Sequence, residues 1–227
     1  MQPEQSLTRV SHFGDESAIV VDRYDRLEIG DRVTRVHQED LCQATGVAPG
    51  RKYQSEGGPS PVQIVDLLRT SMSARTAADA VWRFIDALAW NWLIAGTDAH
   101  AKNYSLLLAN NQVRLAPLYD IASALPYGPH ERNLRLAMKI GGHYDVFLQR
   151  NSWPRAAKEL GVGADVLVDR VRKLALVAAD AFSDAASAPA VIELERDLAP
   201  RLVDLVADRA ARCAALLALG THAAATT

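Results

Sequence analysis

Residues 91–108 read NWLIAGTDAHAKNYSLLL and place four polar, chemically capable side chains within six positions: Asp98, His100, Lys102 and Asn103. One apolar run precedes this cluster and another follows it. Functional side chains often lie on loops that a rigid scaffold positions. The stretch therefore predicts a functional loop between two buried elements, and the segments that flank it decide the fold.

A buried helix is expected before the loop, from about Thr76 to Gly96. Asp79 stands three residues after Thr76, the spacing of a cap. Large apolar residues then recur every three or four positions, the period of a helix: Val81, Phe84, Leu88 and Trp92. An earlier helix is expected to begin after Ser60, where Gln63 completes a capping box and Pro61 suits the first turn. The polar cluster thus follows a helix that is packed into the core.

A β-hairpin is expected after the loop. The apolar runs YSLLLA (residues 104–109) and VRLAPLYD (residues 113–120) are separated by a short polar segment, which is typical of two paired strands. The second run ends at Tyr119 and Asp120. A hairpin at this place can return an acidic side chain to the polar cluster.

The remaining segments predict an α+β fold that is mostly helical. Before residue 60 we expect a strand over 17–27 centred on Ile19–Val21, a hairpin turn at 29–31 and a short helix over 37–46. After residue 133 we expect a strand or loop over 134–142, helices over 153–161, 164–186 and 191–220, a kink in the last helix at Pro200, and a frayed tail over 221–227. No internal repeat or long linker is visible.

Composition fits a soluble globular protein. The chain has 227 residues, of which 49% are hydrophobic and 23% charged, and a formal net charge of −2. This balance argues against nucleic-acid binding by the whole surface. The N-terminus lacks the apolar core of a signal peptide, and no run of about eighteen apolar residues could span a membrane. Cys42 and Cys213 lack metal-ligand spacing and fit buried thiols in a reducing compartment, so we expect a cytoplasmic protein.

Basic residues are frequent in the C-terminal helices, where acidic residues interleave with them. Solvated helix faces explain this pattern better than a DNA-binding surface does. The residues are Arg170, Arg172, Lys173, Arg196, Arg201, Arg209 and Arg212.

The polar cluster has the composition of a phosphoryl-transfer site. Asp98 and Asn103 are five residues apart, as in the D-x-x-x-x-N of a kinase catalytic loop, and the hairpin adds Asp120. One carboxylate can deprotonate the attacking hydroxyl, while an amide oxygen and a second carboxylate suit Mg²⁺. Two alternatives stay open: Asp98 caps a turn beside a packed His100, or a metallohydrolase uses Asp98, His100 and His143.

The amino-acid sequences of several segments, taken in their order along the chain, closely resemble the C-terminal core of HipA-like serine/threonine protein kinases. These kinases are the toxins of bacterial toxin–antitoxin pairs. The resemblance extends over about residues 17–218, through AIVVDRYDR, HQEDLCQATGVAPGRKYQSEGGPSP, NWLIAGTDAHAKNYSLLL, RLAPLYDIAS, LAMKIGGHY and WPRAAKELGV. It implies a kinase-like large lobe over residues 28–220 with a small hairpin at the catalytic loop. Residues 1–27 would be a remnant of the small lobe and the hinge.

The resemblance also implies roles for individual residues, with ATP and Mg²⁺ as cofactors. Asp98 would be the catalytic base. His100, Lys102 and Asn103 would lie at the phosphates, with Lys102 neutralising charge during transfer. Asn103 and Asp120 would bind Mg²⁺, and Tyr119 would precede the metal aspartate.

Asp22, Arg23, Tyr24 and Asp25 would form the hinge at the nucleotide, with Asp25 directed toward the ribose. Without the resemblance, this run fits a charged strand end in solvent.

Two family features are missing before the hinge. Only twenty-one residues precede Asp22, and they contain one glycine, Gly14, and no lysine. The family's glycine-rich loop and strand lysine therefore have no counterpart. The chain could be half of a split kinase completed by a small-lobe partner, a relic with little activity, or an inactive fragment that binds an antitoxin-like partner or DNA.

The partners expected for an active chain are a protein substrate of unknown identity and an antitoxin, with DNA reached only through the antitoxin. A metabolite kinase of related architecture is a further alternative, because the motif does not select the acceptor.

Overall fold

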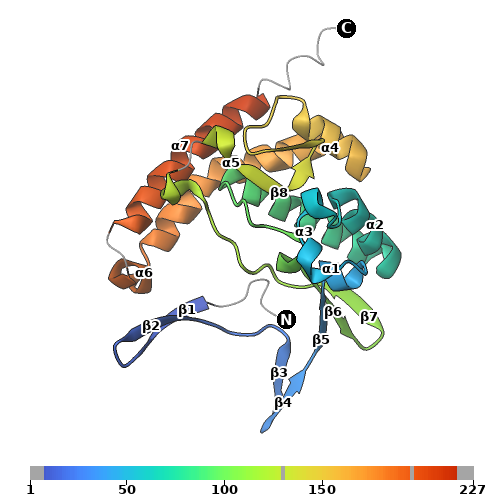
Figure 1. Cartoon of the computed structure of the whole chain (residues 1–227), viewed down its shortest axis with the longest axis vertical. Helices are drawn as coiled ribbons and strands as arrows, with labels where there is room; N and C mark the ends of the chain where they lie inside the picture. The colour runs from blue at the N-terminus through green and yellow to red at the C-terminus, as the bar shows by residue number, and fades with distance from the viewer. Residues whose placement is uncertain (1–7, 129–130, 195–196, 219–227) are drawn as a thin grey trace.

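The computed structural model describes residues 8–128, 131–194 and 197–218. A helical body carries small antiparallel sheets built from β1–β7 at one end and the β8–β9 sheet beside α4, so the expected α+β class is confirmed (Figure 1). The expected tail at 221–227 and Arg196 lie outside the described residues. No helix within the described ranges is both long and apolar enough to cross a membrane.

The helical body is built around α3 (Ala74–Leu93), of whose residues more than half are buried. All four apolar positions that predicted this helix are at most 5% exposed. The helix begins two residues before Thr76, because Ser73 takes the N-cap position and its hydroxyl contacts that of Thr76 at 2.9 Å. Its neighbour α2 (Pro61–Ser71) has the expected capping box between Ser60 and Gln63 and the expected first-turn proline.

The α3 helix ends close to the predicted stop, but Gly96 acts there in an unexpected way. Ala95 is the residue that adopts the left-handed conformation, with φ of 53°, and it is fully buried. A Cβ on Gly96 would lie 2.3 Å from Oδ1 of the buried Asn91. Gly96 is therefore required by close packing at the start of the polar loop.

A three-stranded sheet anchors the loop on its other side. The predicted hairpin is confirmed as β6 (Ser105–Ala109) and β7 (Gln112–Leu115). The expected helix over 37–46 is only partly correct, since His37–Asp40 form strand β5 beside β6. Pairing with a distant strand overrides the local pattern, and the helix shrinks to α1 (Leu41–Ala44), which Asp40 caps.

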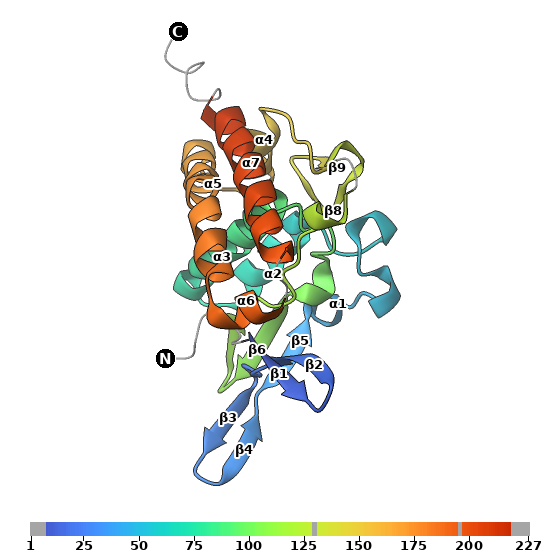
Figure 2. The same cartoon turned by 90° about the vertical axis from the view of Figure 1, so that its left-hand side faces the viewer.

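Two exposed hairpins form the N-terminal part and project from the body (Figures 1 and 2). The first pairs β1 (Thr8–Phe13) with β2 (Glu16–Val21), and the second pairs β3 (Arg26–Ile29) with β4 (Arg32–Arg35). The single strand expected over 17–27 is thus wrong: it is interrupted at 22–25, where Asp25 turns inward and is buried. The turn at 29–31 is confirmed, but the presumed apolar centre is open to solvent, with Ile19 72% exposed.

The C-terminal part is helical. It contains α4 (Ser152–Leu160), α5 (Ala164–Ala186), α6 (Pro189–Leu194) and α7 (Leu198–Ala218), with α5 and α7 side by side (Figure 2). The single kinked helix expected over 191–220 is wrong. Pro200 lies in the first turn of α7, where its missing N–H is tolerated. Segment 134–142 contains β8 (Arg135–Ile140), which pairs with β9 (His143–Asp145).

Short 3₁₀ turns connect these elements at Pro49–Arg51, Gln54–Glu56, Ala101–Asn103, Leu125–Tyr127 and Glu131–Asn133. Both cysteines are buried thiols, as expected. The basic side chains of α5 and α7 fit the interpretation of solvated faces, because Arg170 pairs with Asp86 and Arg172 with Asp169. Arg209 is an exception: it is 2% exposed, and its guanidinium donates to the carbonyls of Trp92 and Val146.

Candidate functional site

The polar loop leaves α3 and closes in the 3₁₀ turn Ala101–Asn103 before β6 begins. Asn103 is 6% exposed, and its Nδ2 donates to the Asp98 carbonyl at 3.0 Å. The backbone N–H of His100 donates to the same carbonyl at 2.8 Å. These bonds fix the backbone of Asp98, while 62% of its side chain is exposed. The loop therefore holds an accessible carboxylate on a rigid backbone.

Tyr53 contacts this carboxylate and was not identified by the sequence analysis. Its phenol donates a hydrogen bond to Oδ1 of Asp98, and that bond is the main cause that raises the pKa of Tyr53 to about 12. The carbonyl of the preceding residue, Lys52, accepts a bond from Ala101 N at 3.2 Å. The two segments are 45 residues apart, so no local pattern could have revealed the contact. The one signal in the sequence was that Tyr53 lies within HQEDLCQATGVAPGRKYQSEGGPSP, a segment that resembles the family.

His100 is buried beneath the loop and is 5% exposed. Its Nε2 lies 3.8 Å from Oδ1 of Asp98, and its Nδ1 has no hydrogen-bond partner among the described residues. Burial, and next the charge of Lys52, lower the pKa of His100 below its ordinary value of 6.5. The imidazole is therefore neutral at physiological pH and can accept or donate one further bond.

Tyr119 connects the end of the hairpin to the polar loop. Its phenol donates to the carbonyl of Lys102 at 2.7 Å and lies 2.6 Å from the hydroxyl of Ser105. Burial raises the pKa of Tyr119, so this phenol stays protonated. Asp120 follows in the left-handed conformation, with φ of 55° and an exposed side chain. The expected return of this acid to the loop is confirmed, since Asn103, Tyr119 and Asp120 line one small hollow.

The expected hinge residues reach this region through Tyr24, whose ring stacks on that of Tyr119 with centroids 5.9 Å apart. Asp25 is 1% exposed, and its carboxylate binds Arg23 at 2.7 Å and Arg26 at 2.5 Å. The hydrogen bonds from Arg23, above all, lower the pKa of Asp25. This carboxylate is held by two guanidinium groups, and its expected contact with a ribose stays a prediction. Asp22 pairs with Arg9 at 2.6 Å.

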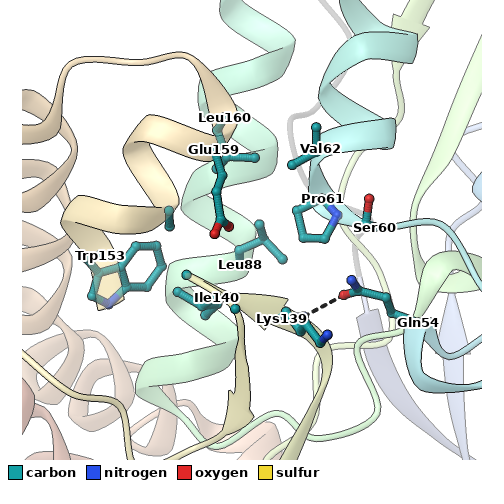
Figure 3. Close-up of a pocket in the computed structure, with 13 residues that line it drawn as sticks. Gln54, Ser60, Pro61, Val62, Leu88, Lys139, Ile140, Trp153, Glu159 and Leu160 are labelled. Atoms are coloured by element: carbon teal, nitrogen blue, oxygen red, sulfur yellow. Dashed lines mark hydrogen bonds between the residues drawn. The ribbon is translucent and has the colours of Figure 1, made fainter. Parts of the chain in front are cut away.

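A larger pocket of about 240 Å³ lies between α2, α3, α4 and β8 (Figure 3). Its lining is mainly apolar and includes Pro61, Leu88, Ile140 and Trp153. Gln54 stands at its edge and accepts a bond from Lys139 N at 2.7 Å. None of the polar-loop residues lines it, so the pocket and the candidate site are separate.

The metallohydrolase alternative finds no support in the described part of the chain. No group of three or more histidine, cysteine, aspartate or glutamate side chains is arranged there to hold a metal ion. Asp98, His100 and His143 in particular do not form such a group. The oxygen pair of Asn103 and Asp120 has different chemistry, which suits a hard cation with other ligands.

Comparisons with known proteins agree on one protein family for this chain. Residues 4–185 match the HipA-like C-terminal domain family. The chain is 37% identical over 194 residues to the candidate kinase Y4mE of Sinorhizobium fredii, covering 85% of this chain and 45% of that protein. It is 31% identical over 146 residues to the serine/threonine-protein kinase toxin HipA of Shewanella oneidensis, covering 60% of this chain and 33% of that protein.

The fold also matches a solved structure. A chain in the complex of Shewanella oneidensis HipA, HipB and operator DNA superposes with a TM-score of 0.83 at 24% identity, covering 95% of this chain and 53% of that one. At this identity the match establishes the fold alone. The chain spans less than half the length of the two relatives compared above.

Proposed function

Because the chain belongs to the HipA-like C-terminal domain family, we propose that it is the large lobe of a HipA-type serine/threonine protein kinase that transfers the γ-phosphate of ATP to a protein hydroxyl. The observation that carries the proposal is the shared hollow of Asn103 and Asp120 beside the exposed carboxylate of Asp98. A base for the acceptor and a pair of oxygen ligands for Mg²⁺ are the parts that phosphoryl transfer requires.

The residues present fit a magnesium nucleotide. The buried Nδ1 of His100 and Oε1 of Gln38 have no partner among the residues that the structure describes. Buried polar atoms are usually hydrogen-bonded, so a bound nucleotide would supply the partner that these two atoms lack. Asn103 and Asp120 would hold the Mg²⁺ ion, which when bound would neutralise phosphate charge. Lys102 and His100 would contact the phosphates, and Asp22 to Asp25 would border the nucleotide through their backbone.

Each residue then has a defined task in transfer. Asp98 accepts the proton of the acceptor hydroxyl, because its carboxylate is exposed on a backbone fixed by Asn103. Tyr119 holds the loop through the carbonyl of Lys102. Neutral His100 can bind a phosphate oxygen or the nucleotide by hydrogen bonding without altering the net charge. Positioning and charge stabilisation supply most of the rate in such reactions.

We assign residues 28–220 to the large lobe and residues 1–27 to the hinge and a remnant of the small lobe, in a cytoplasmic protein. A separate small-lobe partner is favoured by the two N-terminal hairpins, whose large apolar side chains lie open to solvent. Exposed apolar surface of this kind is typical of contact sites. The residues are Phe13, Ile19, Val21, Leu27, Ile29 and Val33. By analogy with the HipA–HipB–DNA complex, an antitoxin would be a second partner, and DNA would be reached through it.

The test is calorimetric titration of the purified chain with ATP and Mg²⁺. Asp120→Asn should abolish Mg²⁺-dependent binding, since it removes the charge while keeping a side chain that tolerates the left-handed backbone. Asp98→Ala should keep binding and abolish transfer. Asp145→Asn is the matched control, with the same charge change at an exposed position on β9. Equal binding by wild type and Asp120→Asn would refute the metal site, and no binding at all would favour a non-catalytic fragment.

A further inference from the structure

Tyr53 touches the proposed catalytic base directly. Its phenol donates to one carboxylate oxygen of Asp98, while most of that side chain stays exposed. We propose that Tyr53 is a positioning residue, which fixes the Asp98 carboxylate through one oxygen and leaves the other directed at the acceptor hydroxyl. The inference rests on the proposed kinase function and adds a residue to its machinery.

Tyr53 is itself held rigidly by its own segment. Its carbonyl accepts bonds from Glu56 N at 3.0 Å and from Gly58 N at 2.9 Å. Gly58 packs so tightly that an added Cβ would lie 2.8 Å from the Tyr53 carbonyl oxygen and 2.6 Å from that of Arg51. The glycine in this turn is therefore required by the conformation that presents Tyr53. A fixed backbone reduces the freedom of the phenol to leave Asp98.

The ring of Tyr53 is fixed by the catalytic loop as well. Its centroid lies 5.2 Å from that of His100 in an edge-on contact, and the Lys52 ammonium lies 5.1 Å above it. The carbonyl of Lys52 binds Ala101 N, within the loop. The two segments thus meet through backbone, ring and hydroxyl. Only the hydroxyl contacts the carboxylate, so its effect can be separated from packing.

A phenol suits this task at physiological pH. The pKa of Tyr53 is raised to about 12, chiefly by its bond to Asp98, so the group remains a donor over the whole working range. A donor of this kind orients a carboxylate without adding a charge. If the contact instead blocked the base, removing the hydroxyl would accelerate transfer, which gives the opposite sign in the experiment.

The experiment compares Tyr53→Phe with wild type. Phenylalanine keeps the ring contacts with His100 and Lys52 and removes only the hydroxyl. We expect unchanged Mg-ATP affinity by calorimetry, an unchanged KM for ATP, and a kcat for phosphate release from ATP that is lower by about 10- to 100-fold, the order expected for a misplaced catalytic group. Tyr127→Phe is the matched control, because that side chain is 81% exposed.

A kcat that is unchanged or higher in Tyr53→Phe overturns the inference, and so does a loss of Mg-ATP affinity. A second measurement decides the contact even if wild type has no activity. Chemical unfolding of Tyr53→Phe, Asp98→Ala and the double variant should give non-additive effects if the two side chains are coupled. Additive effects overturn the inference. Coupling in a chain that neither binds nor transfers would support the contact and refute the proposed function instead.

Discussion

Tyr119 offers a direct test of how the hairpin holds the polar loop at 98–103. Substitution by phenylalanine keeps the ring that stacks on Tyr24 but removes a hydroxyl with two partners. The Lys102 carbonyl loses a donor at 2.7 Å, and Ser105 loses a partner at 2.6 Å. Ser105 retains the bond from Gln38 Nε2 at 3.2 Å. The substitution therefore affects the Lys102 carbonyl more than Ser105, because Ser105 keeps another hydrogen-bond partner.

The expected cost follows from these contacts. A net hydrogen bond contributes about 1 kcal/mol, and both bonds of this half-buried phenol lie near solvent, so we expect Tyr119→Phe to lower the free energy of unfolding by about 1–2 kcal/mol. For a chain of this size each kcal/mol corresponds to about 2–4 °C in Tm. The predicted decrease in Tm is therefore about 2–8 °C, measured by circular dichroism.

Tyr127→Phe serves again as the control, with no change expected at its exposed position. The substitution should also weaken Mg-ATP binding, because the loop that carries Asn103 loses its link to the hairpin. An unchanged Tm in Tyr119→Phe would refute the argument that this phenol braces the loop. A large loss of stability with intact binding would show that the bond supports the fold and not the site.

Two further outcomes follow from the loop and from the end of α3. Burial and the charge of Lys52 hold the pKa of His100 in the folded chain below 6.5, so the unfolded chain takes up a proton first on acidification. The free energy of unfolding should therefore fall as pH drops below about 6.5 and level off below the pKa of the folded state. Lys52→Met should raise the His100 pKa part of the way, as followed by NMR, and an unmoved or lowered midpoint would contradict the assignment. Gly96→Ala should cost about 1–3 kcal/mol in denaturant unfolding, because its Cβ would lie 2.3 Å from Asn91 Oδ1; wild-type stability would show that this packing can relax.

Local signals predicted the elements that lie on either side of the site. The capping box at Ser60, the apolar period of α3 and the polar turn between β6 and β7 each act within a few residues, and each was confirmed. The elements that failed depend on distant partners. Strand β5 exists because it pairs with the distant strand β6, with Gln38 opposite Leu107 and Asp40 opposite Ser105. Such pairing cannot be read from the local pattern of His37–Asp40.

The N-terminal run shows a different limit. Ile19 and its neighbours fit the pattern of a buried strand, yet their side chains are exposed, because within the described residues β1 and β2 form a sheet of two strands. Asp25 fits the pattern of a solvent-facing acid, yet it is buried between Arg23 and Arg26. Alternation of apolar and polar residues predicts which side chains share one face of a strand. Only the tertiary structure determines whether that face packs against the core or lies in solvent.

For the site, residue type and spacing predicted the loop members, and three-dimensional contacts supplied the residues around them. Asp98, Asn103 and Asp120 were identified by a motif whose chemistry requires carboxylates and an amide. Tyr53 was missed because a phenol has no fixed place in that motif. Arg209 was assigned to a solvated helix face because acidic residues interleave with the basic ones, but its bonds to two carbonyls tie α7 to the end of α3.

The contacts that hold the polar loop come from the body of the molecule. Tyr53, Asn103 and Tyr119 bond to the loop, β5 pairs with the strand that follows it, and the segment at 22–25 adds the ring of Tyr24. The loop geometry therefore does not depend on the exposed hairpins β1–β4. If the proposed kinase function is correct, a small-lobe partner that binds their apolar faces would cover the nucleotide and add charge at its phosphates, while Asp98 and Asp120 already have their positions. This asymmetry favours nucleotide binding by the chain alone over transfer by the chain alone, because binding needs the loop and the metal ligands, while transfer also needs the phosphates held in line.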